Sequence, residues 1–268
     1  MADIGVIDRQ EMVFRALDDL CSSLTPEQWA LPTDCPGWSV QDNLSHIIGT
    51  ECMILGRPAP DHDPGEKPWV RNPIGAGNEV QVDYRRSWPP EKVLEELREV
   101  SGERIKALRA LTASDLDDES WTPVGQGTVA DLIAIRIMDM WVHEQDIRRA
   151  VGKPGGLDGP VAEHAFERHS TALPFVVGKK AAAPDGSTVV FEVTGPAGGT
   201  VAVGVEGKRA NRLDAVPDAP TVKITTDLET FSRLCTGRGD PSQLRSKVTI
   251  EGDRELGDRI VDQMNFMI

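Results

Sequence analysis

The pattern of apolar and polar positions divides the chain into a helical first part and a strand-containing second part. Apolar residues recur at helical spacing from Ile4 to Leu24, where a Thr-Pro pair ends the run. Capping signals at Ser39 and Thr128 open two more amphipathic segments, and Pro90 opens another. Four long helices of this kind predict a helical bundle in the first part of the chain.

The segment between the second and third of these helices has a different amino-acid composition. Residues 57–90 are rich in Pro, Gly, Asp and Asn. A connection of this length between helices is uncommon unless it is a binding loop or a lid. We therefore expect residues 57–90 to form a loop that lines a pocket, with His62 exposed in it, and we expect the acidic residues 115–119 to form a second loop.

The second part of the chain has the alternation and the turns of a small sheet. Runs of β-branched residues at 188–193 and 200–205 flank a Gly-rich turn, which predicts a hairpin, and residues 221–225 and 247–250 read as further strands. A helix over residues 161–175 precedes them, so we place the domain boundary near residue 180. The predicted fold class is mixed, α with α/β: a four-helix bundle over residues 1–180 and a small α+β domain over residues 181–268.

Composition and charge exclude several classes of partner. The 268 residues carry 43 Asp and Glu against 29 Lys and Arg, a formal net charge of -14, which repels nucleic acid and anionic membranes. The chain has no apolar run of about 18 residues, and Met1–Leu20 lacks the features of a signal peptide. We therefore expect a cytoplasmic protein with no nucleic-acid or membrane partner, either a monomer or a homodimer. The four cysteines include no CxxC pair and are expected to be reduced.

Candidate chemistry is concentrated in the last helix of the predicted bundle. Asp139, His143 and Asp146 are separated by four and three residues, so all three project from one helix face. Apolar residues occupy the rest of the circumference, which predicts that these ionisable groups are buried or line a cleft. Buried ionisable groups need a charge partner, a hydrogen-bond network or a metal. A structural ion pair with Arg136 or Arg149 is the alternative to a ligand role for Asp146.

His46 lies on the second helix, away from the apolar stripe that contains Leu44 and Ile48. Taken alone, such a position is typical of a solvated surface histidine. A functional role requires that another element cover this face. The helix that carries Asp139 is the element we consider for that role.

Two stretches resemble the signatures of a known family. Residues 35–47, Cys-Pro-Gly-Trp-Ser-Val-Gln-Asp-Asn-Leu-Ser-His-Ile, and residues 141–148, Trp-Val-His-Glu-Gln-Asp-Ile-Arg, are similar to those of the mycothiol-dependent maleylpyruvate isomerase family in the DinB-like superfamily. The resemblance implies a DinB-like bundle that holds a divalent metal through His46, Asp139 and His143, followed by a sterol-carrier-like domain. Asp139 stands where the isomerase has the longer glutamate.

The donor set agrees with that implication. Two imidazoles and one carboxylate leave coordination positions open for water, thiolate or substrate, as catalytic sites require. This set suits zinc, and it would also accept nickel, cobalt, iron or manganese. The resemblance further implies mycothiol as the thiol cosubstrate. Its metal-bound thiolate would then attack a small electrophilic substrate, in a thiol S-transferase or a cis-trans isomerase reaction.

Four other residues are predicted to contribute to the site. Asp146 is expected to orient an imidazole, as the partners of metal-bound histidines do. Arg238 is expected to bind a substrate carboxylate, unless it is an ordinary loop arginine. Trp38 and Trp141 flank the site in sequence and are expected to contact the thiol cofactor, although core packing is the alternative. His164 and His169 are expected to be structural or exposed.

Two other functions remain open at the level of the sequence. In one, the second domain binds a lipid or another apolar ligand and the bundle is a metal-free scaffold. In the other, the metal is present but the protein is a hydrolase or lyase that uses no thiol. The identity of the substrate does not follow from the fold class.

Overall fold

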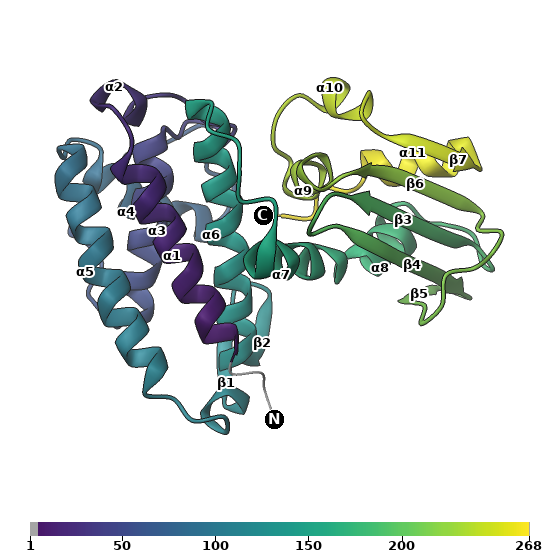
Figure 1. The fold of residues 1–268 in the computed structure, drawn as a ribbon, viewed down its shortest axis with the longest axis horizontal. Helices are drawn as coiled ribbons and strands as arrows, with labels where there is room; N and C mark the ends of the chain where they lie inside the picture. Colours follow the sequence, from purple (N-terminus) through teal and green to yellow (C-terminus); the bar gives the residue numbers. More distant parts are fainter. Residues whose placement is uncertain (1–4, 268) are drawn as a thin grey trace. The chain divides into compact units, whose positions relative to one another are not determined.

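The computed structural model describes residues 5–267, which form two compact units that divide between Gly156 and Leu157 (Figure 1). Ile4, the first apolar position of the predicted first helix, lies outside the described residues. The division falls before the boundary that we expected near residue 180. The reason is that helix α7 (Gly159–Ser170) packs against α9 (Leu228–Thr236) of the second unit, and the left-handed Gly156 (φ 68°) precedes it.

The first unit contains the predicted four-helix bundle. In it α1 and α3 each pack against both α5 and α6. The four helices are α1 (Gly5–Ser22), α3 (Val40–Ile54), α5 (Pro90–Arg109) and α6 (Val129–Val151). The apolar positions that predicted them meet in the interior, where Leu17, Leu44, Ile47, Leu97 and Ile133 are fully buried.

Local sequence signals explain where the two helices of greatest interest begin and end. Ser39 forms a capping box with Asp42 at the start of α3, and Thr128 forms one with Asp131 at the start of α6. Gly152 ends α6 in the left-handed conformation (φ 67°), which glycine adopts at little cost. These signals set the register of both helices and hence the faces on which their polar residues lie.

The expectation that residues 57–90 form a loop throughout is wrong, because helix α4 (Pro73–Arg85) lies within it. Asn72 caps this helix, and its buried positions are Glu79, Val82 and Arg85. Two of these three are charged, so α4 shows almost no apolar stripe in the sequence. The helix packs closely on α3, since a Cβ added at Gly49 would lie 2.4 Å from the Cβ of Gln81.

Short elements complete the first unit. A single turn of helix, α2 (Pro26–Trp29), precedes α3, and the 3-10 turn η1 (Asp115–Asp117) follows α5. The expected acidic loop after α5 continues into an antiparallel hairpin, β1 (Glu119–Thr122) and β2 (Gly125–Thr128), which leads directly into α6.

The second unit is the predicted α+β domain, built on a five-stranded sheet of order β5-β4-β3-β6-β7. The predicted hairpin joins β3 and β4 as an antiparallel pair, whereas β3 and β6 run parallel. The strands are β3 (Thr188–Thr194), β4 (Gly199–Glu206), β5 (Arg209–Arg212), β6 (Val222–Asp227) and β7 (Thr249–Gly252). The edge strand β5 is polar and was not predicted.

The remaining helices of the second unit are short. Besides α7 and α9 they are α8 (Leu173–Phe175), the π-helical turn η2 (Val176–Lys180), α10 (Pro241–Arg245) and α11 (Arg254–Asp262). Within residues 5–267, no helix is both long enough and apolar enough to span a membrane.

Candidate functional site

Helices α3 and α6 bring three predicted ligands together inside the first unit. His46 Nε2 lies 3.2 Å from Asp139 Oδ2, and His143 Nε2 lies 3.6 Å from Asp139 Oδ1. One ligand atom from each residue lies within 4.8 Å of the others. His46 is only 6% exposed, so the alternative of a solvated surface histidine is wrong: α6 covers its face.

The electrostatic surroundings of His46 and Asp139 favour the forms of these two side chains that bind metals. Burial lowers the pKa of His46 below its usual value, which favours the neutral imidazole. For Asp139, burial acts to raise the pKa, but the charge of Arg136 is the largest opposing effect and the pKa stays well below the ordinary range. A neutral imidazole and an ionised carboxylate are the ligating forms of these side chains. The donor set therefore fits a divalent metal ion.

A chain of buried ion pairs fixes the carboxylate. Arg136 Nη1 contacts Asp139 Oδ2, and Arg136 Nε donates to Glu51 Oε1 at 2.7 Å. The other oxygen of Glu51 accepts from Arg104 Nε at 3.0 Å. Because Arg136 is itself held by the fully buried Glu51 carboxylate, Asp139 has little freedom to turn away from the histidines.

Trp38 forms an aromatic wall beside both histidines. Its ring centroid is 5.2 Å from that of His46 and 5.8 Å from that of His143. The indole N–H donates to Glu79 Oε2 at 3.0 Å, and the indole of Trp69 donates to the same oxygen, also at 3.0 Å. Glu79 therefore holds the wall in place.

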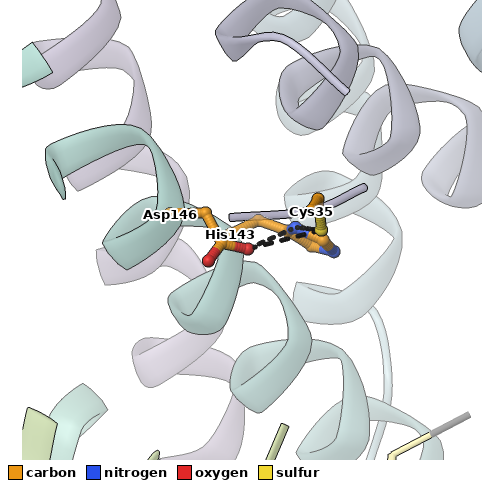
Figure 2. Close-up of side chains that lie close together, drawn as sticks. All are labelled: Cys35, His143 and Asp146. Carbon is orange, nitrogen blue, oxygen red and sulfur yellow. Dashed lines mark hydrogen bonds and ion pairs between the residues drawn. The ribbon is translucent and has the colours of Figure 1, made fainter. Parts of the chain in front are cut away.

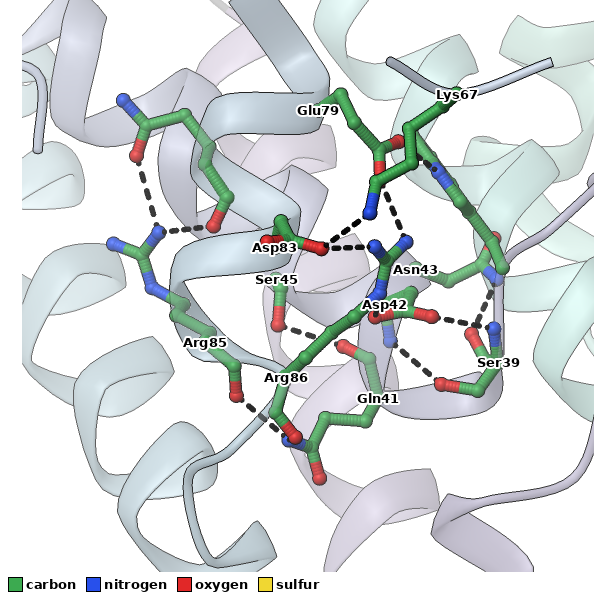
Figure 3. Close-up of polar contacts among 12 residues, drawn as sticks. Ser39, Gln41, Asp42, Asn43, Ser45, Lys67, Glu79, Asp83, Arg85 and Arg86 are labelled. Carbon is green, nitrogen blue, oxygen red and sulfur yellow. Dashed lines mark hydrogen bonds and ion pairs between the residues drawn. The ribbon is translucent and has the colours of Figure 1, made fainter. Parts of the chain in front are cut away.

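Glu79 is a site-positioning residue that the sequence did not reveal. It is 1% exposed and lies on α4, in the segment that was expected to be a loop. Its second oxygen pairs with Arg86 Nη2 at 2.7 Å, and Arg86 also pairs with Asp42 at 3.2 Å (Figure 3). The sequence contains one clue: Glu79 is an acidic residue that follows the N-cap residue Asn72 within the same helix.

The ring of His143 has a second polar neighbourhood on its Nδ1 side. Nδ1 lies 2.7 Å from Asn43 Oδ1, 3.3 Å from Asp146 Oδ2 and 4.0 Å from Cys35 Sγ. Cys35 Sγ donates to Asp146 Oδ2 at 3.6 Å, and the side chains of Cys35, His143 and Asp146 converge in Figure 2. Asp146 also pairs with Arg149, so it takes part both in the imidazole contact and in the alternative ion pair.

Three other residues singled out in the sequence have contacts of their own. The indole of Trp141 donates to the Gly156 carbonyl at 2.7 Å and the side chain is buried, which is a packing arrangement. Arg238 belongs to the second unit, where its Nη1 donates to the Thr236 carbonyl at 3.1 Å. His62 is half-buried rather than exposed, because its Nε2 lies 2.7 Å from Asp83 Oδ2.

Comparison with known proteins gives matches along most of the chain. A family model described as the mycothiol maleylpyruvate isomerase N-terminal domain matches residues 11–148, and one described as the MDMPI C-terminal domain matches residues 163–259. Uncharacterized proteins of two Mycobacterium tuberculosis strains are each 24% identical over 226 residues, which is 83% of this chain and 80% of theirs.

Solved structures show the same fold. A crystal structure of mycothiol-dependent maleylpyruvate isomerase is 15% identical with a TM-score of 0.57, and one of its histidine-to-alanine mutant is 16% identical with a TM-score of 0.58. Each match covers 94% of this chain and 96% of the solved chain. At this level of identity the likeness concerns the fold.

Proposed function

Because this chain belongs to the mycothiol maleylpyruvate isomerase family, we propose that it is a metal-dependent and mycothiol-dependent enzyme that acts on a small electrophile. The observation that carries the proposal is the convergence of His46, Asp139 and His143 in the unit that matches the N-terminal family model. Its reaction is a cis-trans isomerisation or the transfer of the thiol to the electrophile. Its location is the cytoplasm.

In this proposal His46, Asp139 and His143 hold the metal, and zinc is the ion that best suits two imidazoles and a carboxylate. A divalent metal ion held there would lower the pKa of an adjacent thiol and so supply the nucleophilic thiolate at neutral pH. Arg136 keeps the Asp139 carboxylate ionised and oriented. Trp38 excludes water from one side of the two imidazoles.

The covalent chemistry follows from the thiolate. In the isomerase version a bound thiol would supply a nucleophile that adds reversibly to a conjugated double bond; because the same thiolate would leave again, no electrons would be gained or lost overall. In the transferase version the carbon–sulfur bond remains and a proton from solvent completes the product.

Two further residues are assigned roles within the proposal. Asp146 helps to orient the imidazole of His143, from which its Oδ2 is 3.3 Å distant. Arg238 binds a carboxylate of the substrate, since a guanidinium recognises a carboxylate with two parallel hydrogen bonds. Trp141, whose indole already binds a backbone carbonyl, supports the α6 helix instead of contacting the thiol.

The first experiment measures metal content and metal affinity. Wild-type protein, His46→Ala and the control His62→Ala are stripped with chelator, dialysed against Zn²⁺ and analysed for metal. We expect about one Zn²⁺ per chain in wild type and in the control, and a large loss in His46→Ala, since three protein ligands are reduced to two. Equal zinc contents in His46→Ala and wild type would contradict the assignment of the ligands.

The second experiment separates the alternatives. Mycothiol is titrated into zinc-loaded and metal-free protein, and we expect saturable binding only to the loaded form. Metal binding without thiol binding would favour a hydrolase or lyase. A lipid recovered by organic extraction of protein that binds neither metal nor thiol would favour the binding-module alternative.

A further inference from the structure

The orientation of the Asn43 side chain is determined by its neighbours. Its amide nitrogen lies 2.8 Å from the Ser39 carbonyl oxygen, which can only accept. The same nitrogen lies 2.9 Å from Thr33 Oγ1. The single hydroxyl hydrogen of Thr33 is donated to the Trp38 carbonyl at 2.9 Å, so Thr33 Oγ1 also acts as an acceptor toward Asn43. Both amide hydrogens of Asn43 therefore have partners.

The opposite amide orientation is disfavoured. A flipped Asn43 would place its oxygen against the Ser39 carbonyl oxygen and its NH₂ group against the ring of His143. The amide oxygen consequently faces His143 Nδ1 at 2.7 Å, within the normal range for a hydrogen bond. An amide oxygen accepts and never donates, so the hydrogen of this bond belongs to Nδ1.

Between the two neutral tautomers of the imidazole, this hydrogen bond selects one. A neutral imidazole carries a single N–H, and with that hydrogen on Nδ1 the lone pair is on Nε2. Nε2 is the nitrogen that faces Asp139, at 3.6 Å from Oδ1, on the side of His46. The other neighbours of Nδ1 are farther away, with Asp146 Oδ2 at 3.3 Å and Cys35 Sγ at 4.0 Å.

We propose that Asn43 is a positioning residue: through its bond to Nδ1 it holds His143 in the tautomer whose Nε2 lone pair points at the candidate metal position. This inference rests on the proposed function for the metal, but the tautomer itself is a property of the metal-free protein. The group Cys35, His143 and Asp146 has the spacing of a second metal site. In our proposal it is instead a hydrogen-bonding shell, because Asn43 already accepts from the nitrogen that a second metal would need.

The decisive measurement is the tautomer of His143 in metal-free protein. The chain has five histidines, so ¹⁵N-histidine labelling gives a simple long-range ¹H–¹⁵N spectrum, in which His143→Gln identifies the signals of interest. We expect Nδ1 to be the protonated nitrogen in wild type and the two tautomers to be mixed in Asn43→Ala. Protonation of Nε2 in wild type would overturn the inference even if Asn43→Ala failed to fold.

Metal affinity provides the second measurement. Zn²⁺ is titrated in competition with a chelator, and Asn43→Ala should bind it about 10–100-fold more weakly than wild type. Gln41→Ala is the matched control, since it also removes a buried side-chain amide from α3. The amide of Gln41 donates to the Arg85 carbonyl at 2.9 Å and makes no hydrogen bond to His143. The control should keep the wild-type affinity. An Asn43→Ala affinity within about twofold of wild type would refute the role, because the expected loss is at least about tenfold.

The two measurements also separate this inference from the proposed function. If wild type binds no Zn²⁺, the proposed function fails, whereas the Nδ1-protonated spectrum still decides the tautomer. If wild type binds Zn²⁺ and Asn43→Ala binds it equally well, the proposed function stands and the positioning role is wrong.

Discussion

Replacing Glu79 by Gln tests how the aromatic wall beside the histidines is held. The carboxylate is buried, it accepts from the indoles of Trp38 and Trp69 through one oxygen, and it pairs with Arg86 through the other. Breaking a buried charge pair from one side costs about 3–5 kcal/mol. The amide oxygen of the substituted side chain retains one set of partners, worth about 1 kcal/mol. The expected loss is therefore about 3 kcal/mol.

This loss is large enough to measure precisely. All six tryptophans lie between Trp29 and Trp141, so tryptophan fluorescence reports unfolding of the first unit only. For a unit of this size, about 3 kcal/mol corresponds to a fall in melting temperature of about 6–12 °C. Quenching of Trp38 in the native state should also change in Glu79→Gln, because a neutral amide oxygen is a weaker acceptor for the indole N–H than the carboxylate oxygen it replaces.

The control is Glu95→Gln, on the exposed face of α5. It removes the same charge from the first unit and should change stability by less than about 0.5 kcal/mol. A Glu79→Gln protein whose unfolding matches that of Glu95→Gln would refute the idea that Glu79 holds the two indoles. A loss of stability accompanied by unchanged Zn²⁺ affinity would show that the wall does not position the histidines.

Three further outcomes are expected. Asp139→Asn should weaken Zn²⁺ binding by at least about tenfold, because the anionic ligand is lost, and competition with a chelator measures it; an unchanged affinity would exclude Asp139 as a ligand. Gly49→Leu should lower the melting temperature of the first unit, because its Cβ would meet Gln81 at 2.4 Å, and overpacking costs about 1–3 kcal/mol; a melting temperature equal to that of wild type would contradict the close packing of α3 on α4. Burial lowers the pKa of His169 from 6.5 to about 4. The part of the free energy of unfolding that depends on a neutral His169 imidazole is therefore complete above pH 6.5 and is lost as the pH falls toward 4. The loss amounts to about 3 kcal/mol at most, and chemical denaturation followed by circular dichroism should show a flatter pH dependence for His169→Gln; identical pH profiles would contradict a buried neutral imidazole.

The sequence was sufficient for the parts of the fold in which burial follows a simple period. The bundle helices and the β3–β4 hairpin were predicted because their apolar residues repeat at about 3.6 or 2 positions and their ends carry Ser, Thr or Gly signals. The family signature selected His46, Asp139 and His143, and α3 and α6 place these residues together. That these three residues bind a metal remains a prediction, which the zinc measurements test.

Helix α4 shows where periodicity fails. Its buried face contains Glu79, which pairs with Arg86 and accepts from the distant Trp38, and Arg85, which pairs with Glu96 of α5. A charged residue reads as exposed in a linear pattern, because the pattern contains no information about a distant partner. Only the packing of α4 against α3 turns these residues into interior ones.

The boundary between what the chain determined locally and what the tertiary structure decided is clearest around His143. Helical spacing alone placed it on one face with Asp139 and Asp146. Spacing could not say which ring nitrogen faces the candidate metal position, since the nitrogen on the other side of the ring is bound to Asn43, 100 residues away in the sequence. Periodicity determines the face of a helix from nearby residues, whereas tautomer, burial and charge state depend on contacts that form only when α3, α4 and α6 pack together.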